Sequence, residues 1–102
     1  MKVTYKGVPY QVGYTRAAAR DAERAGFDIN ECSNKPNLMV PILVFYAFRA
    51  YNRKISQTLV EEIYEQLPRK DDFVAALIEQ YGDTVNTLMD NSDQGNAEWT
   101  MD

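Results

Sequence analysis

The chain has 102 residues, a formal net charge of −4, one cysteine and no histidine. This length fits one domain that buries about two thirds of its unfolded surface, so no disulfide or metal is needed to stabilise it. Without histidine, the sequence excludes a conventional zinc site and imidazole catalysis, and Cys32 is expected to be a small hydrophobic residue rather than a nucleophile.

The excess negative charge lies at the C-terminal end. From residue 90 onward all charged residues are acidic, whereas residues 1–89 are neutral overall. Because proteins that bind the nucleic-acid backbone usually present a basic face, we expect no nucleic-acid partner. The first residues show no charged segment followed by a long apolar run, which predicts no secretory signal and a location in a reducing cytoplasm.

Residues 2–12 predict a β-hairpin. Apolar residues alternate on both sides of Lys6-Gly7, where glycine suits the turn, and Pro9 marks the second strand as an edge. A lone hairpin is only marginally stable in water, so we expect it to pack on helices.

A first helix is predicted over residues 16–25, with Thr15 as its N-cap and Gly26 ending it. Phe27 is expected to fold back near Ala22. One side of this helix has a row of arginines spaced four apart, which we interpret as a solvated, partly paired face rather than an anion-binding stripe. These are Arg16, Arg20 and Arg24.

The most apolar stretch is LMVPILVFYAFRAY, residues 38–51. A helix that is hydrophobic on all sides belongs in a packed core or a bilayer, and spanning a bilayer takes about 20 apolar residues. The run reaches Arg49 after eleven residues, which excludes a membrane span. We therefore predict a central core helix over about 40–53, with Pro41 in its first turn and residues 38–39 as a lead-in.

Further helices are predicted over 57–67, capped by Ser56, and over about 71–81, ended by Gly82. These two would form an αα-hairpin, and a short fifth helix would follow from Asp83. The sequence has no glycine-rich phosphate loop, nucleophile elbow or paired metal-ligand motif, so we predict no catalytic, cofactor-binding or metal-binding residues and no enzyme activity.

The predicted fold is therefore mainly α (α+β). Residues 1–90 form one domain, in which an N-terminal β-hairpin packs on a bundle of four to five helices around the central hydrophobic helix. Residues 91–102 are polar and acidic, with too little apolar surface to offset the entropy of ordering, and are predicted to be a flexible acidic segment.

The candidate partner-binding residues are aromatic and apolar side chains near the end of the central helix and in the C-terminal segment. For the aromatic residues near the end of the central helix, a core position is the favoured alternative. A tryptophan in an acidic segment has no local core to join, so it docks on its own body, on a neighbour or on a partner. The candidates are Tyr46, Phe48, Tyr51, Trp99 and Met101.

The order of segments resembles a known family. The segments are VTYKGVPYQV, ERAGFDINE, KPNLMVPILVFYAF, ISQTLVEEIYEQLPRKDD and the terminal GNAEW. Together they resemble small proteins of phages and prophages that look like the tail-assembly chaperones of long-tailed phages.

This resemblance implies a largely helical protein of the bacterial host cytoplasm that is absent from the mature virion. It also implies the tape-measure protein as partner, with the major tail protein and further copies of the chain as additional ones.

Two other functions compete with this interpretation. One is a structural head-tail connector or tail-completion component, which would be found in purified particles. The other is a small helical DNA-binding regulator, which is disfavoured because the helix over 71–81 offers no arginine, lysine or asparagine to read bases.

Overall fold

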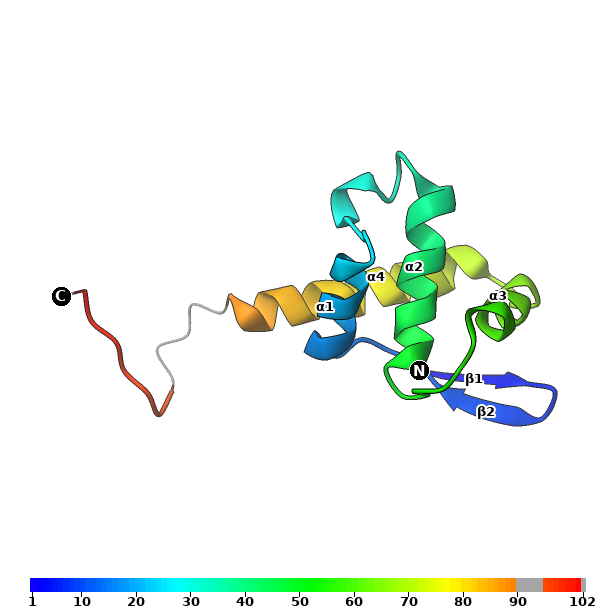
Figure 1. The fold of residues 1–102 in the computed structure, drawn as a ribbon, viewed down its shortest axis with the longest axis horizontal. Helices are drawn as coiled ribbons and strands as arrows, with labels where there is room; N and C mark the ends of the chain where they lie inside the picture. Colours follow the sequence, from blue (N-terminus) through cyan, green and yellow to red (C-terminus); the bar gives the residue numbers. More distant parts are fainter. Residues whose placement is uncertain (90–94, 102) are drawn as a thin grey trace.

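The computed structural model describes residues 1–89 and 95–101. Its elements in chain order are β1 (Lys2–Tyr5), β2 (Val8–Gln11), α1 (Arg16–Arg24), the short 3-10 helix η1 (Ile29–Glu31), α2 (Pro36–Arg49), α3 (Gln57–Glu65) and α4 (Lys70–Leu88). An antiparallel hairpin followed by four α-helices confirms the predicted α+β fold (Figure 1).

The hairpin has the predicted turn. Val3 pairs with Tyr10 and Tyr5 with Val8, and the two turn residues, Lys6 and Gly7, have φ values of 49° and 80°. Positive φ at both central residues is the type I′ geometry that matches the twist of the flanking strands. The hairpin is fastened to the helices by the Tyr5 hydroxyl, which donates a hydrogen bond to Glu62 Oε2 at 2.8 Å.

Both ends of α1 follow the predicted capping pattern. The Thr15 side chain accepts a hydrogen bond from the Ala18 N–H at 3.1 Å, so it satisfies a donor that the first turn leaves unpaired. Gly26 has a φ of 105°, and the Phe27 N–H donates to the Ala22 carbonyl at 2.9 Å. The return of the chain at Phe27 is therefore confirmed.

Helix α2 begins earlier and ends earlier than predicted. It starts at Pro36, which occupies the first turn, and ends at Arg49 rather than near residue 53. Pro41 lies inside the helix, so the prediction that the helix begins near Val40 was wrong. Because proline has no N–H, the carbonyl of Asn37 loses its hydrogen bond within the helix. Asn37 and Pro41 are both exposed, so water can hydrate that carbonyl.

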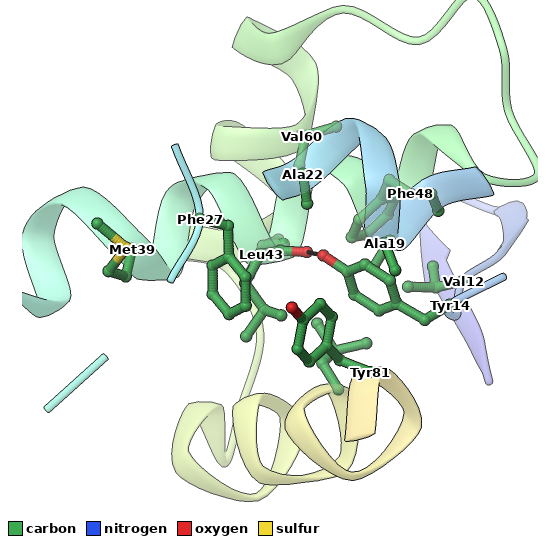
Figure 2. Packing of buried hydrophobic residues seen from close by; sticks show 14 of the residues in the cluster. Val12, Tyr14, Ala19, Ala22, Phe27, Met39, Leu43, Phe48, Val60 and Tyr81 are labelled. Carbon is green, nitrogen blue, oxygen red and sulfur yellow. Dashed lines mark hydrogen bonds between the residues drawn. The ribbon is translucent and has the colours of Figure 1, made fainter. Parts of the chain in front are cut away.

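Helix α2 is nevertheless the hub of the domain, because α1, α3 and α4 all contact it. Its fully covered face consists of Met39, Leu43, Val44, Ala47 and Phe48. Figure 2 shows the rings of Tyr14, Phe27 and Tyr81 gathered around Leu43 between α2 and α4. The Tyr14 hydroxyl donates to the Leu43 carbonyl at 2.5 Å, which ties the segment before α1 to the middle of α2.

The expected fourth and fifth helices are one continuous helix, α4. The prediction that Gly82 ends a helix was wrong, because Gly82 lies inside α4 without the positive φ of a helix terminus. A glycine inside a helix costs only about 1 kcal/mol relative to alanine, which the burial of the neighbouring Tyr81 offsets. Helix α3 ends at Glu65, two residues before the predicted end.

The C-terminal segment is described from residue 95 to residue 101, where it has no helix or strand. Residues 90–94 and 102 lie outside the described part of the chain, so the flexibility of 91–102 stays a prediction. Among the described helices none combines the length and hydropathy needed to cross a bilayer.

Candidate functional site

An apolar groove lies between α2 and α3. Its volume is about 310 Å³, and its apolar lining includes Val40, Pro41 and Phe45 from α2 with Val60 and Tyr64 from α3. The groove exists because α2 is apolar on all sides, while α3, with nine residues, is shorter than the fourteen-residue α2 and covers only part of this side. We call these residues, with the polar residues described next, the α2–α3 groove.

The polar lining of the groove is acidic. Gln57, Glu61 and Glu65 are exposed, come from α3 and are spaced four apart, which places them in one row along the helix. No lysine or arginine lines the groove. Lys70 lies close by, with its ammonium 5.8 Å from the centroid of the Tyr64 ring. This ammonium caps the C-terminal end of α3, because it donates hydrogen bonds to the Glu65 and Leu67 carbonyls at 3.0 and 2.9 Å.

The apolar surface continues beyond the groove along α2. Leu38, Pro41 and Phe45 are spaced three and four residues apart, which puts them on one stripe of the helix. Leu38 is 62% exposed, although leucine is usually found inside proteins. The groove and the stripe together form an uncovered apolar surface with an acidic edge.

The residues predicted as partner-binding are not brought together in one place. Phe48 is fully buried at 0% exposure, so it belongs to the core and is unavailable to a partner (Figure 2). Tyr46 is half-buried, with the Arg49 guanidinium 5.9 Å from its ring centroid, and Tyr51 is exposed just after α2. Trp99 and Met101 are exposed in the C-terminal segment.

Sequence reasoning missed the groove residues Val40, Pro41, Phe45 and Tyr64. Two signals pointed to them. The first is that a helix apolar on every side has apolar surface all round, and helices packed on some of its sides leave part of that surface open. The second is the row of Gln57, Glu61 and Glu65 beside the apolar positions of α3, which is typical of a helix that offers a polar edge to an amphipathic partner.

Three groups with raised pKa values lie in the core or against it. Burial raises the pKa of the Tyr14 hydroxyl well above its usual range. Burial, and then a short hydrogen bond donated to Glu23, raise the pKa of Tyr81. Burial and the nearby Asp28 carboxylate raise the pKa of the Cys32 thiol, a direction that disfavours the nucleophilic thiolate. Within residues 1–89 and 95–101 no cluster of three or more Cys, Asp or Glu side chains could hold a metal ion.

Comparison with known families gives one match. Over residues 1–102 the chain matches the model of a family described as Domain of unknown function (DUF5055). The chain belongs to this family. In the comparisons with curated proteins and with solved structures, nothing matches this DUF5055 chain.

Proposed function

We propose that this DUF5055 domain is a non-catalytic binding protein, namely a phage tail-assembly chaperone that holds the helical tape-measure protein in the host cytoplasm. The α2–α3 groove is the observation that supports this proposal. It offers an uncovered apolar surface on a small domain, which is what a chaperone for a long helical client needs.

The chemistry of the groove specifies the kind of client segment that fits it. Its apolar lining suits the apolar face of an amphipathic helix, and the carboxylates of Glu61 and Glu65 favour lysine or arginine on the flank of that helix. Each such contact is weak, but a client of many helical turns offers many sites, and multivalency makes the coating firm. The major tail protein would join this complex as a second partner.

The test is co-expression with the tape-measure protein, measured as the soluble amount of that protein that co-purifies. The double substitution Glu61→Lys and Glu65→Lys should reduce this amount about tenfold, because it reverses the charge of the groove edge. A matched control reverses Glu79 and Asp83, which are also exposed and spaced four apart, but lie on α4 away from the groove.

A tape-measure protein that stays insoluble with the wild-type domain would refute the chaperone proposal. Equal loss in both double variants would refute the groove as the client site. Recovery of the domain from purified particles would instead support a structural component of the virion, and a specific complex with DNA would support a regulator.

A further inference from the structure

A second concave surface lies between α1 and the C-terminal end of α2. It has a volume of about 290 Å³, and its lining includes Tyr46, Arg49 and Arg53 on one side with Thr15, Ala17 and Asp21 on the other. We call it the arginine cleft. Its lining has two arginines and one carboxylate, and the Arg49 guanidinium lies over the Tyr46 ring.

The C-terminal segment of the chain has the complementary chemistry. Trp99 is 81% exposed and Met101 is 88% exposed, although both side chains are of types that gain from burial. Glu98 stands next to Trp99, and no basic residue occurs after residue 89. Residues 95–101 therefore carry one carboxylate, no basic side chain and an exposed indole.

We propose that residues 95–101 of one copy dock in the arginine cleft of a second copy. The Trp99 indole would stack on the guanidinium of Arg49, which then lies between two aromatic rings, and Glu98 would pair with Arg53. The Asp21 carboxylate on the opposite wall offers an acceptor for the indole N–H. This contact involves copies of the chain alone, so it stands independently of the proposed client.

Charge favours this cleft over the α2–α3 groove. The α2–α3 groove is edged by Glu61 and Glu65, which repel an acidic segment, whereas the arginine cleft attracts it. The concavity between α1 and α4 is a weaker competitor. It has Arg16 and Arg20, but it also contains Glu23 and has no aromatic ring on which an indole could stack.

The direction of α4 favours a second copy over the chain's own cleft. Figure 1 shows α4 crossing behind α2 and running outward past α1, so that the C-terminal end of α4 points away from α2. If two copies exchange their segments, the contact closes a dimer, whereas docking into the next copy in line continues into rings or open chains.

The experiment uses the full chain and its single tryptophan. Trp99 emission should shift to the blue, and sedimentation should speed up, as protein concentration rises. Trp99→Ala should abolish concentration-dependent sedimentation. Arg49→Gln with Arg53→Gln should weaken association about tenfold or more. Arg16→Gln with Arg20→Gln is the matched control and should associate like the wild type.

Mixing two defective variants gives the sharpest test. Trp99→Ala keeps the cleft and loses the indole, whereas the Arg49 and Arg53 double variant keeps the indole and loses the cleft. Together they should form a 1:1 dimer that does not grow further, because only one functional contact remains.

Other outcomes overturn the inference. A blue shift that is independent of concentration, with no dimer on mixing, would place the segment in its own cleft. Emission of an exposed indole at all concentrations would show no docking. Circular dichroism of each variant verifies that the fold is retained. Neither result would change the client-binding test, since that test reverses charges in the α2–α3 groove.

Discussion

Tyr14 links three parts of the domain, and its hydroxyl offers a clean test of how the core is held. Tyr14 is buried between the hairpin and α1, its N–H donates to Gln80 Oε1 at 3.1 Å, and its ring meets the Tyr81 ring edge-on with centroids 5.8 Å apart. The hydroxyl donates to the Leu43 carbonyl at 2.5 Å (Figure 2). Tyr14→Phe removes this one bond and keeps the ring.

The expected loss of stability is about 1–1.5 kcal/mol, the typical net contribution of one hydrogen bond between neutral groups. The loss stays near this range because the Leu43 carbonyl keeps its bond within α2, so no buried acceptor is orphaned. In a domain of this size, about 1 kcal/mol lowers Tm by about 4–8 °C. We therefore expect Tm to fall by about 4–12 °C.

Thermal and urea unfolding followed by circular dichroism measure this change. The control is Tyr10→Phe. Tyr10 is a half-buried tyrosine that packs near Phe48, with ring centroids 6.2 Å apart, and its hydroxyl has no hydrogen bond within the described residues. Tyr10→Phe should change stability by less than about 0.5 kcal/mol. If both variants lose the same amount, the Tyr14 hydroxyl does not anchor α2, and the reasoning is refuted.

Three further predictions concern pH, helix continuity and the C-terminal segment. The pKa values of Tyr14 and Tyr81 are raised above 10.0 in the folded protein, because folding favours their neutral forms. Their contribution to the free energy of unfolding should therefore be complete below pH 10, and it should fall by about 1.4 kcal/mol per pH unit for each residue as pH rises further. A free energy of unfolding, measured with urea, that stays the same between pH 9 and 11 would contradict this pH dependence. Gly82→Ala should stabilise the protein by about 0.5–1 kcal/mol, because an added Cβ meets open space inside α4, and a lower Tm would mean that Gly82 is a terminus after all. Deletion of residues 91–102 should leave Tm nearly unchanged, since Trp99 is exposed, whereas a large decrease would place Trp99 in the core.

The local signals in the sequence predicted local structure well. Thr15 and Ser56 cap the helices that follow them, and Gly26 ends the helix before it, because each effect depends on one side chain and the adjacent backbone. The hairpin is confirmed for the same reason, since Lys6-Gly7 sets the turn and the turn sets the register.

The errors arose where tertiary packing outweighs a local preference. Pro41 and Gly82 both disfavour a helix interior, yet α2 and α4 continue through them. Proline inside a helix costs about 3 kcal/mol or more and glycine about 1 kcal/mol. On the same helices Leu43, Phe48, Leu77 and Tyr81 are buried in one core, and each contributes about 1.5–3 kcal/mol. A sequence window shows the local cost but not the packing that offsets it.

The candidate surfaces depend on helix lengths and packing angles that no local pattern gives. The apolar excess of residues 38–48 predicts that some of α2 must be covered by something, but not which side stays open. That side is set by the position of α3, which packs on one flank of α2 and leaves Pro41 and Phe45 at the edge of the contact. For Phe48 the sequence left a binding role open but favoured a core position, and its side chain lies among the buried residues of the core.

The uncovered stripe on α2 is not required by the fold. The buried face of α2 already holds Leu43, Ala47 and Phe48, each at 0% exposure, and α1, α3 and α4 complete their packing. A polar residue in place of Leu38 would leave these contacts intact and would make the domain more soluble, so folding alone does not explain an apolar side chain there. The same holds for Trp99, which contributes nothing to the core while remaining the largest exposed aromatic side chain. The α2–α3 groove has an acidic edge at Glu61, whereas the arginine cleft is basic at Arg49. In the two proposals the groove therefore holds a basic helix and the cleft holds the C-terminal segment of the next copy, so the two ligands do not compete for one site.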